Sequence, residues 1–242
     1  MISVRQEFTQ EMQLVSNKLA EVIKAKKTHL CIGIDPPEKY YTGKIIDLVK
    51  NTKDYCVAYK INLAHFISRT CFYDLYQVLT EIHTICPENM IILDGKFGDI
   101  GSTNDYYAKL SQRNNIDGLT LNPYSGIENL EPFFNQKGSL HFVLTRMSQP
   151  SFMQTKEVCT EIVNQTKGRC GYVLTTREED YFDLVTELSE DSFLLLVGIG
   201  AQGGKISLMN KLKHNNFIFN VSRPFFEDQN VVNTAKFYAR IK

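Results

Sequence analysis

The sequence lacks the closely spaced cysteine and histidine groups that hold a metal ion or build a disulfide framework. The six cysteines stand at positions 31, 56, 71, 86, 159 and 170 without a Cys-x-x-Cys pair, and the five histidines form no ligand cluster beside them. Structural zinc sites and disulfide-rich folds need such groupings. We therefore expect reduced, buried thiols, a cytoplasmic location and no metal site.

An excess of one charge and a long apolar run are also missing. Lys plus Arg and Asp plus Glu each number 27, so no overall field attracts nucleic acid or an anionic membrane. No run approaches the roughly 18 apolar residues of a membrane span. Residues 1–27 have the pattern of an amphipathic helix without the apolar centre of a signal peptide. We expect neither a membrane nor nucleic acid among the partners.

Eight short apolar runs are present instead, at 30–35, 56–61, 90–93, 118–121, 140–144, 171–174, 193–199 and 217–221. Helices are expected near 44–50, 71–85, 104–112, 178–188 and from about 229. Strands that alternate with helices indicate a parallel sheet buried on both faces, and eight such units in about 250 residues match a (β/α)8 barrel. The sequence predicts an α/β fold, a single (β/α)8 TIM barrel domain over residues 1–242, with an N-terminal helical extension at 1–28.

Polar residues recur where the predicted strands end. The carboxyl ends of barrel strands share one face, which carries the functional groups. The residues at these ends are Asp35, Lys60, Asn62, Asp94, Lys96, Asp99, Asn122, Ser148, Gln202 and Arg223. Each one alone could be a turn former or a surface residue. Their shared position favours a functional site.

The stretch 93–103, LDGKFGDIGST, concentrates this chemistry. The two-residue period of a strand points Asp94 and Lys96 to the same face, while Asp99 falls on the loop beyond. Charges at the end of a buried strand cost several kcal/mol unless they are paired or used. We therefore expect a carboxylate and an ammonium in one site.

Residues 198–204, GIGAQGG, spell the Gly-x-Gly-x-x-Gly pattern of dinucleotide-binding domains. Only 38 residues follow Gly204, too few for the remaining nucleotide-binding half of such a domain. The glycines fit better as a loop that exposes backbone N–H groups to a phosphate at a helix start. Arg223, just past the eighth run, would add a charge-assisted contact to that phosphate. The alternative role for Arg223 is a surface salt bridge.

The motifs, taken together, resemble those of the orotidine 5'-phosphate decarboxylase family. LDGKFGDIGST is similar to the family's Asp-x-Lys-x-x-Asp signature. CIGIDPP, YKINLAHF, LNPYSGIENLEPF, VGIGAQGG and NVSRPFF resemble further family motifs in the same order, over about residues 29–226. The resemblance implies cofactor-independent decarboxylation of orotidine 5'-monophosphate (OMP) to UMP, the last step of de novo pyrimidine synthesis, by a homodimer with shared active sites.

The resemblance also implies a role for each matching residue. Lys96 would protonate the C6 carbanion, in a charged array with Lys60, Asp94 and Asp99, the last donated by the partner subunit. For substrate binding it implies Asp35 at the ribose together with Lys60, and Asn62 beside the pyrimidine or ribose. It also implies Thr103 at the ribose across the interface, Ser148 at the pyrimidine, and Gln202, Gly203 and Arg223 at the phosphate.

Two other functions remain open at this point. A metal-dependent sugar-phosphate decarboxylase or aldolase of the same superfamily shares the Asp-x-Lys-x-x-Asp strand, but such relatives carry an acidic metal ligand where this chain has Lys60. A non-catalytic nucleotide-binding protein could also use the same barrel, because a fold alone does not fix a function. Asp94, Lys96 and Asp99 argue for catalysis.

Overall fold

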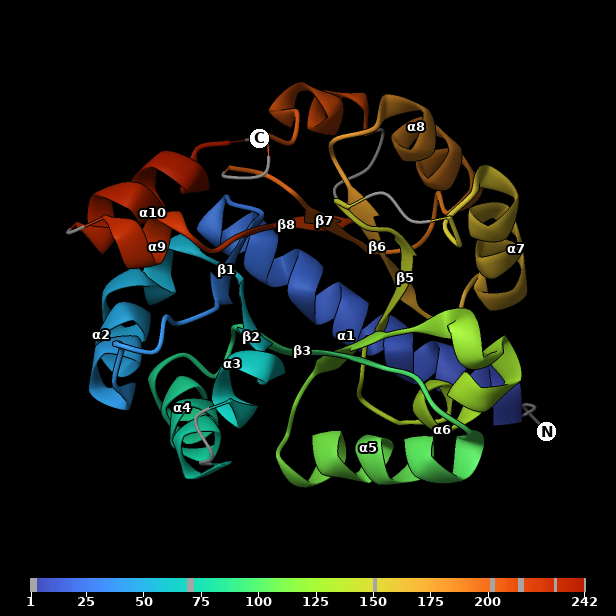
Figure 1. The fold of residues 1–242 in the computed structure, drawn as a ribbon, viewed down its shortest axis with the longest axis horizontal. Helices are drawn as coiled ribbons and strands as arrows, with labels where there is room; N and C mark the ends of the chain where they lie inside the picture. The colour runs from blue at the N-terminus through green and yellow to red at the C-terminus, as the bar shows by residue number, and fades with distance from the viewer. Residues whose placement is uncertain are drawn as a thin grey trace.

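The computed structural model is a closed barrel of eight parallel strands in sequence order (Figure 1). It describes residues 4–68, 72–149, 152–200, 203–212, 216–228 and 230–241, with side chains from Met12 onward. The strands are β1 Leu30–Ile34, β2 Ala58–Asn62, β3 Met90–Phe97, β4 Gly118–Leu121, β5 Phe142–Arg146, β6 Gly171–Thr175, β7 Leu194–Val197 and β8 Phe217–Val221. The predicted (β/α)8 barrel is confirmed.

Helices surround the strands on the outside of the barrel (Figure 1). The α-helices are α1 Val4–Lys26, α2 Thr42–Thr52, α3 Leu63–Ile67, α4 Phe72–Ile85, α5 Gly101–Arg113, α6 Glu131–Phe134, α7 Lys156–Thr166, α8 Glu179–Leu188, α9 Pro224–Glu227 and α10 Val231–Ala239. The 3-10 helices are η1 Lys53–Tyr55, η2 Pro123–Ser125, η3 Ile127–Leu130 and η4 Ile206–Lys211. None of these described helices is long and apolar enough to cross a membrane.

The strands are apolar because they are buried on both sides. Their outer side chains, such as Tyr59 and Leu93, pack under the helices in one large core cluster. Their inner side chains, such as Ile92 and Ile218, fill the barrel. All five cysteines in the described part of the chain are buried and free, as expected of core thiols.

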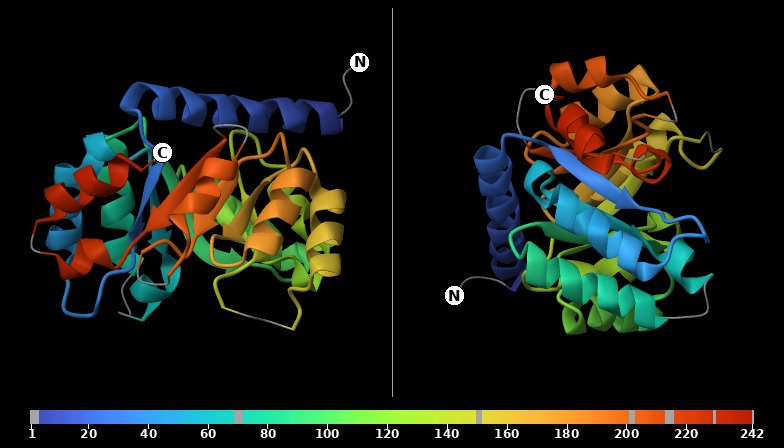
Figure 2. Two further views of the ribbon diagram at one scale, coloured as in Figure 1. Left: turned by 90° about the horizontal axis from the view of Figure 1, so that it is seen from above. Right: turned by 90° about the vertical axis from the view of Figure 1, so that its left-hand side faces the viewer.

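Helix α1 lies across one end of the barrel (Figure 2). Its Leu19 and Ile23 are buried in the cluster that fills the barrel interior. At the end of the helix, the ammonium of Lys26 donates to the carbonyl of Lys53 (2.8 Å) and pairs with Glu88 (2.9 Å). The opposite end of the barrel, where the strands have their carboxyl ends, is left open for a site.

Candidate active site

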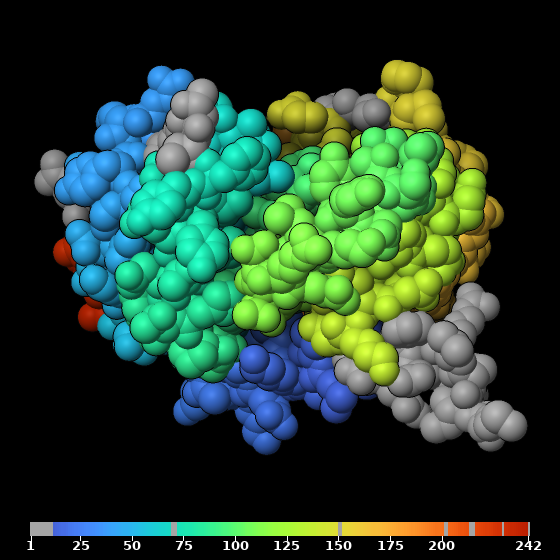
Figure 3. All heavy atoms as spheres, turned by 90° about the horizontal axis from the view of Figure 1, so that it is seen from below, coloured from blue at the N-terminus to red at the C-terminus, as the bar shows by residue number. Residues whose placement is uncertain are grey.

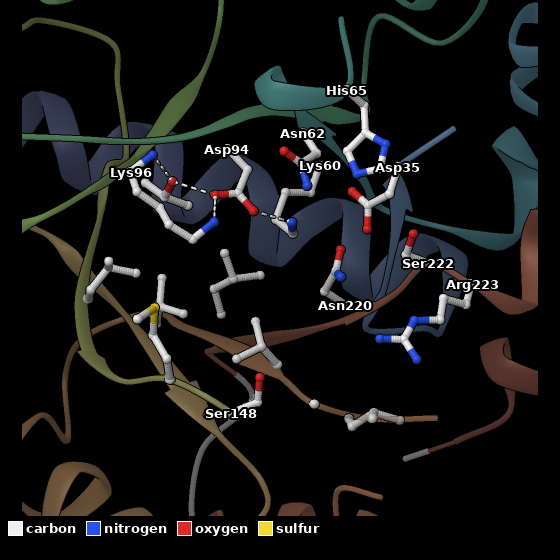
Figure 4. A pocket seen from close by; sticks show the side chains of 18 of the residues that line it. Asp35, Lys60, Asn62, His65, Asp94, Lys96, Ser148, Asn220, Ser222 and Arg223 are labelled. Atoms are coloured by element: carbon white, nitrogen blue, oxygen red, sulfur yellow. Dashed lines mark hydrogen bonds and ion pairs between the residues drawn. The ribbon is translucent and has the colours of Figure 1, made fainter. Parts of the chain in front are cut away.

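A cavity of about 510 Å³ opens at the carboxyl ends of the strands (Figure 4). Its described lining residues come from nearly every strand end: Asp35, Lys60, Asn62, His65, Asp94, Lys96, Thr120, Leu144, Met147, Ser148, Val173, Leu195, Val197, Gly198, Ile199, Asn220, Ser222, Arg223 and Pro224. Asp35, Lys60, Asp94 and Lys96 lie along one side of it (Figure 4). Leu144, Val173 and Leu195, which belong to the apolar cluster inside the barrel, form its floor.

The carboxylate of Asp94 is the centre of a charged array. Its Oδ2 accepts a hydrogen bond from the ammonium of Lys60 at 2.5 Å, and its Oδ1 accepts from the ammonium of Lys96 at 2.8 Å. The hydroxyl of Thr120 also donates to Oδ1, at 2.8 Å. The side chain of Lys60 is only 6% exposed, whereas that of Lys96 is 45% exposed and faces the cavity.

Mutual attraction keeps the buried members of this array charged. Burial alone would raise the pKa of Asp94, but the ammonium groups of Lys60 and Lys96 outweigh it and hold that pKa well below its usual range. Burial alone would lower the pKa of Lys60, and the carboxylates of Asp94 and Asp35 reverse this into a raised pKa. Both groups are therefore ionised at neutral pH.

A backbone irregularity in β3 turns Lys96 into the cavity. The register between β3 and β4 shifts between Leu93 and Phe97, and Lys96 has a φ of 48°, in the left-handed region that non-glycine residues rarely adopt. The N–H of Lys96 donates to the hydroxyl of Thr120 at 3.0 Å, which holds this conformation. Strain of this kind is often stored at functional sites.

Asp35 and its neighbours form one end of the cavity. The Oδ1 atom of Asp35 is buried and has no hydrogen-bond partner among the described residues, so it is free to accept from a ligand hydroxyl. Asn62 caps α3 by accepting from the N–H of Ala64 (3.3 Å). The ring of His65 lies beside Asp35 (Figure 4), and its Nδ1 contacts the carbonyl of Pro36 at 3.1 Å.

Ser148 and Arg223 face this array from other sides of the cavity. Ser148 follows β5 and lies across the cavity from Asp94 (Figure 4). Arg223 directly follows Ser222 at the end of β8, and its guanidinium points into the cavity next to the Asp35 end. The cavity thus offers a cation at each of two separate places, Arg223 at one and Lys96 at the other.

Four predicted residues lie outside the described lining of this cavity, and a fifth is not described. Asn122 accepts from the N–H of Tyr124 (3.0 Å) at the start of η2. Asp99 is exposed on the loop after β3, and Thr103 lies in the first turn of α5. Gly203 sits in the turn after β7 with a φ of 73°. Gln202 lies outside the described residues.

The position of Asp99 is nevertheless fixed by buried contacts. Asn104, which is fully buried, accepts from the N–H of Asp99 (3.0 Å) and donates to its carbonyl (2.8 Å). The hydroxyl of Ser125 donates to the same carbonyl at 3.1 Å. The backbone of Asp99 is therefore held in place on the loop, and its exposed side chain is not among the described residues that line the cavity of its own chain.

The glycine-rich loop differs from the expectation in one respect. The N–H of Gly203 donates to the carbonyl of Gly200 (3.0 Å), and that of Gly204 donates to the carbonyl of Gly198 (2.8 Å). These two N–H groups are therefore satisfied within the loop instead of being exposed to a ligand. The helix that follows is the 3-10 helix η4, which begins only at Ile206.

Several residues that line the cavity were not predicted from the sequence, above all His65, Thr120, Asn220 and Ser222. Asn220 and Ser222 alternate with buried Val221, and this two-residue period could have placed both on the inner face. Gly33 on the neighbouring strand makes room for them, because a Cβ atom there would lie 2.7 Å from the Cβ of Ser222. Thr120 has no comparable signal, since one polar residue in an apolar run is common.

Within the described residues, no group of three or more His, Cys, Asp and Glu side chains is arranged to hold a metal ion. The potential donor Asp94 is instead occupied by two ammonium groups.

Comparison with known proteins gives one consistent result. A family model described as "Orotidine 5'-phosphate decarboxylase / HUMPS family" matches residues 28–238. The orotidine 5'-phosphate decarboxylase of Cupriavidus metallidurans is 34% identical over 202 residues, 73% of this chain and 74% of that protein. That of Flavobacterium johnsoniae is 30% identical over 231 residues, 85% of each.

Among solved structures, the UMP synthase of Leishmania donovani superposes with a TM-score of 0.81 at 25% identity. The match covers 92% of this chain but 54% of that longer one. The likeness therefore holds in sequence across most of the chain and in the arrangement of the barrel. This chain belongs to the orotidine 5'-phosphate decarboxylase / HUMPS family.

Proposed function

We propose that the protein decarboxylates OMP to UMP without a cofactor, as the last step of de novo pyrimidine synthesis. The observation that carries this proposal is the array of Lys60, Asp94 and Lys96 at the wall of the cavity, with Arg223 at a distance from it. Ammonium and carboxylate groups near a reacting carbon, together with a separate cation for a phosphate, suit a nucleotide that loses CO2 from its base. Family membership supports the same activity.

Lys96 is the proposed proton donor. When the bond between C6 and the carboxylate breaks, CO2 leaves and the electron pair stays on C6 as an unconjugated carbanion. The exposed Lys96 ammonium, held at 2.8 Å by Asp94, stabilises this charge as it develops and then transfers a proton to C6. Lys96 is left as a neutral amine, which regains a proton from solvent.

The remaining site residues are proposed to bind the nucleotide. Arg223 holds the phosphate. Gln202 stays a predicted phosphate ligand, whereas the N–H of Gly203 already donates to Gly200 and does not serve the phosphate in this loop conformation. Asp35, whose Oδ1 has no partner, accepts from a ribose hydroxyl near Lys60, and Asn62 lies beside it. Ser148 forms a hydrogen bond with the pyrimidine. Binding energy from the distal phosphate is then available to the reacting carbon.

The active unit is proposed to be a homodimer. Asp99 and Thr103 are outside the described lining of their own chain's cavity, so they would complete the site of a partner. The surrounding surface is suited to such a contact, because α4 and α5 lie on one face of the molecule (Figure 3). Both helices and the residue before α5 carry exposed apolar side chains: Phe72, Tyr73, Tyr76, Ile100, Tyr106 and Leu110.

The direct test is to incubate the pure protein with OMP in the presence of a chelator and to follow the ultraviolet absorbance of the pyrimidine. We expect conversion to UMP at an unchanged rate with and without chelator. Activity that appears only with added divalent metal, or only on a sugar phosphate, would move the assignment to the metal-dependent branch.

The role of Lys96 is tested by Lys96→Ala. We expect kcat to fall by more than about a hundredfold, the usual effect of a positioned proton donor, while UMP still binds through Arg223 and Ser148. Lys50→Ala, at an exposed lysine of α2, is the matched control and should keep full activity. A Lys96→Ala protein that retains more than about a hundredth of the rate rules Lys96 out as the donor.

A further inference from the structure

The turn after β6 lies between the two loops that carry proposed ligand groups. On one side it is hydrogen-bonded to the segment after β7. The N–H of Thr176 donates to the carbonyl of Val197 (3.0 Å), and the N–H of Lys205 donates to the carbonyl of Thr176 (2.9 Å). Val197 lines the cavity, so this turn is attached to the wall from outside.

On the other side, the turn contacts the loop after β5 through Arg177. The Nη1 atom of Arg177 donates to the carbonyl of Ser148 at 2.6 Å. The stem of the same side chain lies next to Gly198 of the glycine loop, since a Cβ atom added to Gly198 would meet Cγ of Arg177 at 3.5 Å and Cβ of Ser148 at 3.6 Å. Arg177 therefore touches two segments of the cavity wall, although it is not among the described lining residues itself.

A second arginine fixes the base of the loop after β5. The buried guanidinium of Arg146 forms a salt bridge with Glu178 (2.8 Å) and donates to the carbonyl of Gln154 (3.2 Å). The side-chain oxygen of Gln154 in turn accepts from the N–H of Met147 at 3.1 Å. The two ends of this loop are thus joined without help from Arg177. What remains for Arg177 is the orientation of Ser148.

We propose that Arg177 is a positioning residue. It orients the hydroxyl of Ser148 toward the pyrimidine, and this orientation depends on the conformation of the glycine loop at Gly198. A charge-assisted hydrogen bond to the Ser148 carbonyl fixes the backbone of Ser148, and the backbone sets the direction in which the side chain leaves the loop. Gly198 lies beside the Arg177 stem, and its φ of 93° is a backbone conformation that residues with a side chain rarely adopt. This inference rests on the proposed role of Ser148 in binding the nucleotide base.

A double-mutant cycle tests the proposal. Arg177→Met removes the donor and keeps the stem, and Ser148→Ala removes the hydroxyl that Arg177 is proposed to aim. In the Ser148 background we expect Arg177→Met to lower kcat/KM for OMP by about tenfold, the scale of one charge-assisted hydrogen bond. In the Ser148→Ala background we expect Arg177→Met to have less than a twofold effect. Arg177→Lys, which keeps one charged donor, should lose less than Arg177→Met.

Two further measurements separate positioning from structure. The melting temperature of Arg177→Met should equal that of Arg240→Met, a change at an exposed arginine after α10, because Arg177 is exposed and the loop base is held by Arg146. An equal penalty for Arg177→Met in both Ser148 backgrounds, or no penalty in either, overturns the proposal.

For the same four proteins of the double-mutant cycle, calorimetry also measures the Kd for UMP, a quantity that does not depend on turnover. Wild-type protein that binds UMP but does not convert OMP refutes the proposed function alone. In that case, coupling between Arg177 and Ser148 in the Kd still supports the positioning role, and its absence refutes it. Wild-type protein that binds no UMP refutes both.

Discussion

At the scale of single residues, the Asp94 carboxylate accepts hydrogen bonds from three groups, the ammonium groups of Lys60 and Lys96 and the hydroxyl of Thr120. Removing this carboxylate would leave the buried Lys60 with Asp35 as its nearest remaining carboxylate partner, and breaking a buried ion pair costs about 3–5 kcal/mol. The lysines and the aspartate are therefore held in one geometry before any substrate binds. Such preorganisation is what a developing carbanion requires.

Arg223 provides the clearest test of phosphate binding. We expect Arg223→Ala to raise KM for OMP strongly and to lower kcat, because in the proposed mechanism the binding energy of the phosphate is used at the reacting carbon. On orotidine, which lacks the phosphate, the same change should have no effect. Steady-state kinetics on both substrates measure this. An equal penalty on both would mean that Arg223 acts on the structure of the β8 end instead.

His141, at the residue before β5, links stability to pH. Burial lowers its pKa from 6.5 to about 3, and its Nδ1 accepts from the N–H of Leu119 at 3.1 Å. In the unfolded chain His141 binds a proton below about pH 6.5, whereas in the folded chain it binds one only below about pH 3. The free energy of unfolding therefore falls as the pH drops from 6.5 to 3. The loss is about 1.4 kcal/mol per pH unit.

We therefore expect the wild type to lose about 2 kcal/mol more than His141→Gln between pH 7 and pH 5, measured by urea unfolding. Glutamine does not titrate and can still accept from Leu119. Equal losses in the two proteins would show that His141 is not the group responsible.

Site residues were easiest to predict from the sequence where they lie close together in one segment of the chain. Asp94 and Lys96 were predictable because they are two positions apart at the end of one strand, and both do face the cavity. His65 and Thr120 were not, because their place depends on how barrel closure brings β2 and β4 beside β3. No spacing within one segment carries that information.

At the scale of elements, the Phe97 ring at the end of β3 packs directly over Gly95, where a larger residue would have no room. A Cβ atom on Gly95 would lie 2.6 Å from Cε2 of the Phe97 ring, which is itself buried against Tyr107. We expect Gly95→Ala to lower the free energy of unfolding by about 1–3 kcal/mol, the usual range for overpacking, when measured by denaturant unfolding.

Gly101→Ala is the matched control. A Cβ atom at Gly101, in the first turn of α5, would lie 3.7 Å from its nearest neighbour, so the change should stay within about 1 kcal/mol of the wild type. If Gly95→Ala is as stable as this control, the Phe97 ring is free to move and the β3 end is less rigid than its contacts imply.

Element existence was easier to predict than element bounds. All eight strands occur near their predicted positions, but β2 begins at Ala58 instead of 56 and β5 ends at Arg146 instead of 144, because pairing with the neighbouring strands sets the ends. Helix α7 was missed altogether. Its buried face consists of Cys159, Ile162, Val163 and Thr166, a helical spacing whose half-polar composition hides the apolar period.

At the scale of the whole molecule, the proposed dimer predicts complementation between two inactive proteins. Lys96→Ala and Asp99→Ala, mixed and allowed to exchange subunits at random, would form mixed dimers in about half of all cases. Each mixed dimer has one site with both lesions and one with neither. Recovered activity should therefore approach about a quarter of the wild-type value per site.

Subunit exchange must be shown independently, for example with a mass-tagged copy of one variant. Exchange without recovery would mean that Asp99 acts within its own chain. Tyr106→Glu, on the exposed face of α5, offers a second view, since it should shift the protein toward monomer in sedimentation and reduce activity together with dimer content.

The helix that crosses the far end of the barrel also bears on the site it never touches. Leu144, Val173 and Leu195 form the floor of the cavity, and the same side chains belong to the cluster that contains Leu19 and Ile23 of α1. This apolar cluster lies between the cavity and the end of the barrel that α1 covers. By covering this end, helix α1 keeps the surroundings of the charged array low in dielectric constant. Water that entered from the α1 end would screen the attraction between the lysines and Asp94, and the rate of the proposed reaction would fall.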